Sequence, residues 1–156
     1  SNEGEIRLVM IVITDSNIFF SALISPEGVV AKILSEKKRI QYLVPEYLLG
    51  EVDEHLERLA KYLNKTRKGL KKEFSKLLEG VKILSMRDIS EENKQKAEEI
   101  VANIDIDDAP FIAFHLQYKH KIWSGDKELK KGLTAKGYGH FFVSTEELRN
   151  KLYKKT

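Results

Sequence analysis

The chain has 156 residues, of which 42% are hydrophobic and 33% are charged, as expected for one soluble globular domain with a sizeable core. It contains no cysteine, which excludes disulfide bonds and thiolate metal sites and fits an intracellular, cytoplasmic protein. No apolar run approaches the roughly 20 residues that a membrane-spanning helix needs, and no signal peptide opens the sequence, so we expect no membrane contact. The net charge of +3 is small, but basic and acidic residues are segregated along the chain.

The first expected strand is the continuous apolar run at residues 8–14, whose β-branched side chains are typical of a strand buried on both faces. Ser1-Asn2 resembles the remnant of a cleaved tag, and Met10 is a candidate native start. We therefore expect residues 1–9 to be a tag remnant plus the start of the first strand, and residues 10–156 to form the domain.

Strands and helices alternate through the rest of the chain. Further strands are predicted at residues 40–44, at 81–84 with a continuation towards residue 89, at 121–124 and at 140–143. Helices are predicted at residues 29–38, 45–63 with Pro45 at the start, 66–79, 90–101, 108–118 and 127–136. A capping box at residues 144–147 opens a terminal helix. This alternation predicts a single α/β domain with a mainly parallel, doubly wound sheet and helices on both faces.

The helices at residues 45–63 and 66–79 are expected to form a helical hairpin that projects from the sheet. The hairpin carries a basic cluster that consists of Lys65, Arg67, Lys68, Lys71, Lys72 and Lys76. A second basic segment begins at Lys127, whereas acidic residues gather at residues 46–57 and 91–108. A basic surface around an acidic pocket suits a polyanionic substrate, but the lysines are equally consistent with a solvated face of a Lys/Glu-rich protein.

Three aspartates, Asp105, Asp107 and Asp108, lie within four positions immediately before an apolar helix. Clustered carboxylates repel one another unless a cation, a basic partner or water offsets their charge. Asp108 followed by Ala109-Pro110 is also a typical helix start, with an N-cap acceptor and a proline in the first turn. Taken alone, this stretch favours a helix cap beside a solvated acidic loop over a metal site.

Three more carboxylates lie where an open parallel sheet places its ligands, beyond the carboxyl ends of the strands. Asp15 follows the first strand, and Asp126 follows the strand at 121–124. Glu51 flanks the apolar stripe near the start of the helix at 45–63. These residues and Asp108 are expected to converge at one edge of the sheet. An oxygen-only site without cysteine or histidine selects hard cations, Mg²⁺ or Mn²⁺.

Each of these residues also has a purely structural interpretation. Asp15 is a candidate turn residue or cap, Asp126 a candidate N-cap, and Glu51 a candidate solvated glutamate. Asn17 and Ser124 are more often turn and cap residues, but they can also hold a carboxylate or a metal-bound water. The histidines show no ligand spacing and are expected to be packed or exposed; they are His55, His115, His120 and His140.

Four short motifs resemble the acidic motifs of PIN-domain nucleases, a family that includes the VapC-type ribonucleases. They are Asp15-Ser16-Asn17, Glu51, Asp107-Asp108-Ala109 and Trp123-Ser124-Gly125-Asp126. The resemblance runs from about residue 11 to residue 142, nearly the whole chain. Individually the motifs are weak, but four carboxylates in this order are fairly specific.

The resemblance implies a single PIN-like domain with a parallel sheet of five strands and a metal-dependent ribonuclease site. It assigns metal binding and catalysis with Mg²⁺ or Mn²⁺ to Asp15, Glu51, Asp108 and Asp126. Asp107 is an alternative or outer ligand, and Asn17 and Ser124 support the site. Hydrolysis of RNA phosphodiester bonds is the implied reaction, with single-stranded RNA as the expected substrate. From the basic segments themselves we expect phosphate contacts from Lys65, Arg67, Lys68, Lys71, Lys72 and Lys127. A homodimer and, for a VapC-like toxin, an antitoxin partner are also implied.

Other classes of protein place aspartates at strand ends as well. A haloacid-dehalogenase-type phosphatase has a second aspartate two residues after the first, where this chain has Asn17. A receiver domain has an acidic pair at the end of its first strand, where this chain has Thr14-Asp15. Both phosphotransfer classes are therefore less favoured. A PIN-like module that binds RNA or protein without cutting is a further alternative, although it would gain little from crowded carboxylates.

Overall fold

The computed structural model describes residues 8–153, so most of the expected tag remnant, residues 1–7, lies outside the described residues, as do residues 154–156. At the centre is a five-stranded sheet in the order β3-β2-β1-β4-β5, and all neighbouring strands pair in parallel. The strands are β1 (Met10–Thr14), β2 (Ile40–Pro45), β3 (Lys82–Leu84), β4 (Ile122–Trp123) and β5 (Phe142–Val143).

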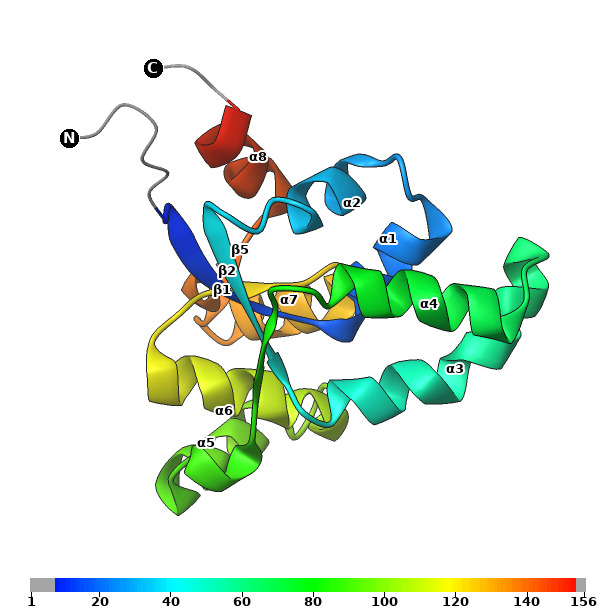
Figure 1. The fold of residues 1–156 in the computed structure, drawn as a ribbon. Helices are drawn as coiled ribbons and strands as arrows, with labels where there is room; N and C mark the ends of the chain where they lie inside the picture. The colour runs from blue at the N-terminus through cyan, green and yellow to red at the C-terminus, as the bar shows by residue number, and fades with distance from the viewer. Residues whose placement is uncertain (1–7, 154–156) are drawn as a thin grey trace.

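Helices cover both faces of this sheet. They are α1 (Ser16–Ile24), α2 (Val29–Leu34), α3 (Leu48–Leu63), α4 (Arg67–Leu77), α5 (Glu91–Val101), α6 (Ala109–Tyr118), α7 (Lys127–Ala135) and α8 (Thr145–Tyr153). Three short 3₁₀ turns are η1 (Met86–Asp88), η2 (Ile106–Asp108) and η3 (Gly139–Phe141). Crossovers between parallel strands are right-handed, so the helices before β3 and those between β3 and β5 cover opposite faces, whereas α8 follows the last strand and packs against α2. Figure 1 shows α1, α2 and α8 on one side of the strands and α5 and α6 on the other. The predicted α/β fold is confirmed.

The winding order reverses between β1 and β4. From β1 the chain moves outward to β2 and β3, and it then returns to the other side of β1 to form β4 and β5. The last residues of the two strands, Thr14 and Trp123, are paired. The backbone N–H of Asp15 donates to the Trp123 carbonyl at 3.0 Å. Ligands bind at such switch points, so the segments that follow β1 and β4 meet where a ligand site is expected.

Apolar packing fixes the helix that carries the acidic stretch. Val12 and Ile13 of β1 are fully buried because helices cover both sides of the central strand. Helix α6 contacts β1, β2 and β4 and buries Phe111, Ile112 and Phe114 against them. Each such side chain stabilises the fold by roughly 1.5–3 kcal/mol. The start of α6 is thereby held at the carboxyl edge of the sheet.

The predicted hairpin is formed by α3 and α4, which project from the body of the domain (Figure 1). Asn64 ends α3 in the left-handed conformation, with a φ of 55°, and the Thr66 hydroxyl accepts the Gly69 N–H at 3.0 Å to begin α4. The root of the hairpin packs on α1, where the rings of Phe19 and Phe74 meet edge to face with centroids 5.8 Å apart.

Pro45 does not begin the long helix as predicted; it is the last residue of β2, and α3 begins at Leu48. Pro45 pairs with Leu84 of β3, and the next hydrogen bond along the chain is donated by the Glu46 N–H to the Leu84 carbonyl at 2.8 Å. Proline has no backbone N–H to donate, but at the end of a strand this removes only one hydrogen bond from the ladder. The parallel pairing can therefore continue up to Pro45.

Four strand predictions were too long, and one of them is the strand expected at 121–124, of which only Ile122–Trp123 forms β4. The first strand begins at Met10 and not within residues 1–9, because Leu8 and Val9 are exposed and lie outside β1. Beyond β3 the chain forms η1 instead of continuing as a strand, and η3 replaces the first half of the strand expected at 140–143.

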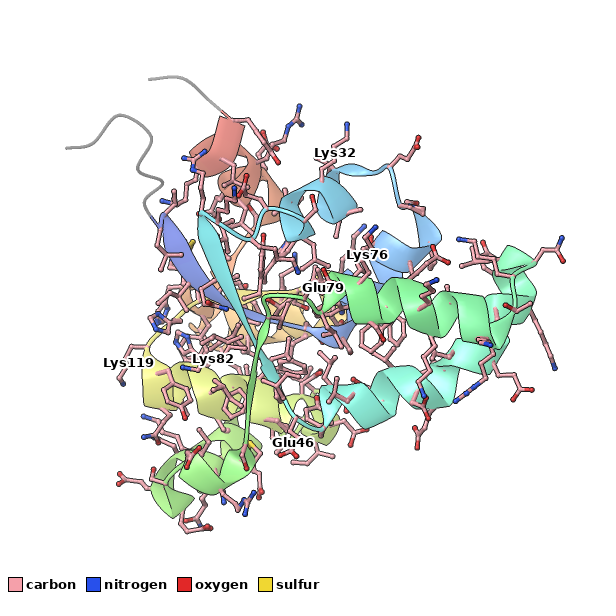
Figure 2. All side chains as sticks on the ribbon, in the orientation of Figure 1. Lys32, Glu46, Lys76, Glu79, Lys82 and Lys119 are labelled. Atoms are coloured by element: carbon pink, nitrogen blue, oxygen red, sulfur yellow. The ribbon has the colours of Figure 1, made fainter. Side chains whose placement is uncertain are left out.

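Charged side chains such as Lys32, Lys76 and Lys119 are exposed on the outside of the domain (Figure 2). Among residues 8–153, none of the helices combines the length and the apolar composition that crossing a membrane requires.

Candidate metal centre

Asp15 is the most deeply buried carboxylate of the centre. It follows β1 directly, is 3% exposed, and occupies the N-cap position of α1 without its side chain capping the helix. Its carboxylate instead accepts hydrogen bonds from neighbouring side chains, from the Ser124 hydroxyl at 2.7 Å, the Asn17 amide at 3.3 Å and the Ser16 hydroxyl at 3.3 Å. The carboxylate is therefore held by side chains at the end of β1 and after β4.

Ser124 and Asn17 connect the two loops at the switch point. The Ser124 hydroxyl donates to Asp15 and accepts the backbone N–H of Asp126 at 3.0 Å. The Asn17 side-chain oxygen accepts the backbone N–H of Gly125 at 2.8 Å. Asp126 in turn caps α7, since its Oδ1 accepts a backbone N–H at 3.0 Å. These contacts fix the β4–α7 loop against the β1–α1 loop.

Asp108 occupies the N-cap position of α6, with Pro110 in the first turn as predicted, but its side chain makes no capping hydrogen bond. The residue is only 9% exposed, and its Oδ2 is buried without a hydrogen-bond partner among residues 8–153. The residue whose side chain acts as a cap in this stretch is Asp105. It accepts the Asp107 N–H at 3.0 Å at the start of η2. The Asp108 carboxyl is thus free for another interaction.

Glu51 lies in the first turn of α3, beside the fully buried Leu48 and Val52. Its position at the edge of the apolar stripe brings part of the side chain below the surface. Oε1 of Glu51 is buried and has no hydrogen-bond partner in the described part of the chain.

The carboxylates of the centre influence one another. Burial is the main cause that raises the pKa of Asp108 to about 8, and nearby negative charges add to it. These charges belong to Asp15, Asp105, Asp126 and Glu51. Burial also raises the pKa of Asp15, although hydrogen bonds from Ser124 and Ser16 oppose the rise. Because such coupling falls with distance, the four predicted carboxylates lie in one region.

All the buried side-chain polar atoms that lack a partner within residues 8–153 belong to this edge of the sheet. They are Thr14 Oγ1, Glu51 Oε1 and Asp108 Oδ2. A buried oxygen without a hydrogen-bond partner destabilises the fold by about 1–3 kcal/mol. Because three such oxygens lie at one edge of the sheet, we infer that a group outside the described chain satisfies them.

The side chains stop short of a closed ligand set. Within the described residues, no three or more histidine, aspartate or glutamate side chains are arranged so that they could hold a metal ion. The donor atoms do fit a hard cation, because they are all oxygens. Glu51 and Asp108 each have one carboxylate oxygen without a hydrogen-bond partner in the described residues. In this structure the carboxylates are thus near one another but not within the spacing of a closed ligand set.

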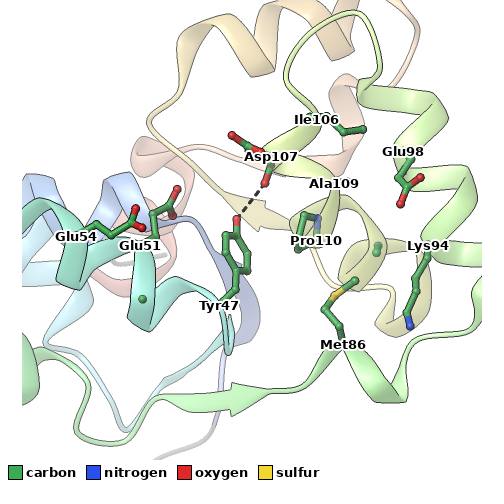
Figure 3. A pocket seen from close by; sticks show the side chains of 12 residues that line it. Tyr47, Glu51, Glu54, Met86, Lys94, Glu98, Ile106, Asp107, Ala109 and Pro110 are labelled. Carbon is green, nitrogen blue, oxygen red and sulfur yellow. Dashed lines mark hydrogen bonds between the residues drawn. The ribbon is translucent and has the colours of Figure 1, made fainter.

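Tyr47 is a residue of this region that the sequence interpretation missed. Its hydroxyl donates to the backbone carbonyl of the exposed Asp107 at 3.2 Å, across the gap between α3 and η2 (Figure 3). The Tyr47 ring packs on Phe111, with centroids 5.7 Å apart. The available signal was its spacing, four residues before Glu51 and so on the same side of that turn.

The predicted RNA-binding cations lie in two places. Lys127 is exposed at the start of α7, next to Asp126. The hairpin cations are partly paired within the hairpin, by Lys65–Glu73 at 3.1 Å, Arg67–Asp53 at 2.9 Å and Lys71–Asp53 at 3.9 Å. Lys68 and Lys72 are exposed and have no ion-pair partner among residues 8–153. Only part of the cluster is therefore available to a ligand without exchanging partners.

The chain is similar to known proteins both in sequence, through a family model, and in fold, through a solved structure. Residues 13–152 match the model of a family described as PIN domain. The solved structure of PAE2754 from Pyrobaculum aerophilum is similar with a TM-score of 0.64, and the match covers 94% of this chain and 92% of that one at 12% sequence identity. At this identity the likeness shows a shared fold alone. No curated protein matches the sequence.

Proposed function

This chain is a member of the PIN-domain family, whose members are generally nucleases that use divalent metal ions, and we propose that it is a Mg²⁺- or Mn²⁺-dependent endoribonuclease. The observation that carries the proposal is the grouping of all unpartnered buried side-chain oxygens of residues 8–153 at the switch point of the sheet. A domain that only bound RNA would have no use for this unsatisfied acidic group.

The residues proposed to hold the ions are Asp15, Glu51, Asp108 and Asp126, with the exposed Asp107 as an outer ligand. Bound divalent ions activate water and offset the negative charge that develops on a phosphate during hydrolysis.

The surrounding residues of the chain position this group. The Ser124 hydroxyl donates to Asp15 and accepts the Asp126 N–H, so one side chain orients two of the proposed ligands. Asn17 fixes the loop after β4 through the Gly125 N–H. Because a bound divalent ion would activate the attacking water, the proposed reaction needs no nucleophilic side chain from the protein.

Phosphates on either side of the reaction site are proposed to contact cations without reading the sequence of the RNA. Lys127 is next to Asp126, where it can contact the phosphate nearest the centre. The hairpin reaches farther, because α3 has 16 residues and is about 24 Å long. Lys68 and Lys72 therefore meet phosphates several nucleotides away, where they contribute to affinity and not to the chemical step.

The implied homodimer and antitoxin partner, like the cytoplasmic location, stay predictions from the sequence and the family resemblance.

The test is cleavage of a single-stranded RNA by the purified chain with Mn²⁺, with and without a chelator. We expect cleavage that the chelator abolishes. Asp15→Asn should lower the rate by about 100-fold or more, because it removes one charged ligand at almost constant volume. The matched control is Asp88→Asn, which makes the same change at an exposed position in η1.

The result separates an enzyme from a binding module. Cleavage that persists in the chelator, or a folded Asp15→Asn protein with full activity, contradicts the proposed role of the centre. Binding of RNA without any metal-dependent cleavage supports the non-catalytic alternative.

A further inference from the structure

A cleft of about 610 Å³ lies immediately beside the acidic centre, between α3, η1, α5 and the start of α6 (Figure 3). Its volume is within the roughly 300–1,000 Å³ typical of small-ligand sites. Met86, Ile106 and Pro110 contribute apolar side chains to its wall. Ile106 is 54% exposed, so its side chain is accessible to a ligand in the cleft.

The cleft is continuous with the proposed metal centre. Glu51 contributes both to the lining of the cleft and to the buried acidic group, and Asp107 lines the cleft next to Asp108. The hydrogen bond from Tyr47 to the Asp107 carbonyl joins the two walls at this junction. An RNA strand with a phosphate at the centre would therefore place a neighbouring nucleoside at the mouth of the cleft.

The charges around the cleft exclude the sugar-phosphate backbone from it. Glu54 lies on the α3 side, and Glu98 on the α5 side (Figure 3). Lys94 is the one basic residue among those that line the cleft, and its Nζ lies 3.1 Å from a carboxylate oxygen of Glu91. A cleft with excess negative charge repels phosphate but accepts a neutral, planar group that has hydrogen-bond donors.

We propose that this cleft binds the nucleobase adjacent to the scissile phosphate and prefers guanine to uracil, an inference that rests on the proposed ribonuclease function. Apolar side chains supply contact area for a base of any kind. Discrimination comes from the Glu98 carboxylate, an acceptor that guanine can satisfy with two adjacent donors, N1–H and the 2-amino group. Uracil has a single N–H on that edge and no amino group.

The experiment measures base preference in two ways. One is the distribution of cut sites in an RNA of mixed sequence with Mn²⁺; the other is fluorescence anisotropy with short guanine- and uracil-containing oligonucleotides in chelator, where no cleavage occurs. We expect wild-type protein to prefer guanine by about tenfold in both. Glu98→Gln should reduce this preference severalfold, whereas the matched control Glu99→Gln, on the same helix but outside the cleft, should keep it.

A second pair of variants tests the volume of the cleft. Ile106→Trp should fill the cleft and lower affinity for guanine-containing RNA about tenfold, while Ile83→Trp, at an exposed position of β3, should not. Melting curves of all variants show that the fold is retained.

The outcomes distinguish this inference from the proposed function. Wild-type protein without metal-dependent cleavage contradicts the function, and the anisotropy measurement still decides whether the cleft selects guanine. Metal-dependent cleavage with no base preference, or a preference that Glu98→Gln and Ile106→Trp leave unchanged, overturns the inference while the nuclease proposal stands.

Discussion

The two sides of the acidic centre differ in how their carboxylates are satisfied. On the side of β1 and β4, Asp15 and Asp126 are both hydrogen-bonded, and Ser124 links them. On the side of α3 and α6, Glu51 and Asp108 each have a buried oxygen with no partner within residues 8–153. The first pair is positioned by hydrogen bonds within the fold, whereas the second has buried oxygens that the described part of the chain leaves unpaired.

The raised pKa of Asp108 indicates the protonation state of this one carboxyl in the metal-free protein. At a pKa of about 8, the Asp108 carboxyl carries a proton at neutral pH. A metal ion must displace this proton, so metal binding and protonation compete at the same group.

The largest expected effect tests whether the unsatisfied side takes part in the reaction. Asp108→Asn should lower Mn²⁺-dependent RNA cleavage by about 100-fold or more, because the amide cannot supply a negative oxygen to the ion. Initial rates at saturating Mn²⁺, compared with those of Asp88→Asn, measure the effect. If the Asp108→Asn variant cleaved RNA at nearly the wild-type rate, Asp108 would take no part in the reaction.

The next effect concerns the stability of the metal-free protein. Between about pH 5.5 and about pH 7 the folded chain keeps the Asp108 proton, whereas the unfolded chain, whose carboxyl has the ordinary pKa of 3.8, has lost it. The folded state binds more protons, so the free energy of unfolding should fall as the pH rises, by about 2 kcal/mol over this window.

Asp108→Asn should abolish this decline and raise the melting temperature at neutral pH by about 4–8 °C. Chemical denaturation in chelator at several pH values provides the measurement. The same pH dependence in wild type and variant would show that another group causes it.

A smaller effect is expected on the satisfied side. Ser124→Ala removes the hydroxyl that joins Asp15 to the Asp126 N–H, which should destabilise the protein by about 1.5 kcal/mol. Without this hydrogen bond, which lowers the pKa of Asp15, Mn²⁺ affinity should fall by about tenfold. Mn²⁺ titration followed by thermal shift measures both quantities. Ser75→Ala, at an exposed position of α4, is the control, and equal behaviour of the two variants would contradict the orienting role.

The smallest effect lies outside the centre, on the hairpin. Lys68→Glu combined with Lys72→Glu should weaken RNA binding severalfold and leave Mn²⁺ affinity unchanged. Loss of two phosphate contacts should make the plot of log affinity against log salt less steep by about 1.4. Fluorescence anisotropy at several salt concentrations gives this slope. An unchanged slope would mean that these lysines are a solvated face of the hairpin.

Local patterns in the sequence determined most of the secondary structure. The unbroken apolar run of β1 and the caps of several helices were predictable because they depend on residues two to four positions apart. The capping box is one case: the Glu147 N–H donates to the Ser144 hydroxyl at 3.0 Å, and the Glu147 carboxylate accepts the Ser144 N–H at 3.1 Å. Pro45 was misplaced because its fixed φ suits the end of a strand as well as the start of a helix.

Only the tertiary structure decided what each aspartate at a helix start does. Asp15, Asp108 and Asp126 all occupy N-cap positions, yet only the Asp126 side chain caps its helix. The difference arises because β1 and β4 are neighbours in the sheet, which brings Ser124 to Asp15, and because α6 packs across the sheet and buries Asp108. Burial and contacts between distant segments are properties of the packed chain, and no spacing within one segment contains them.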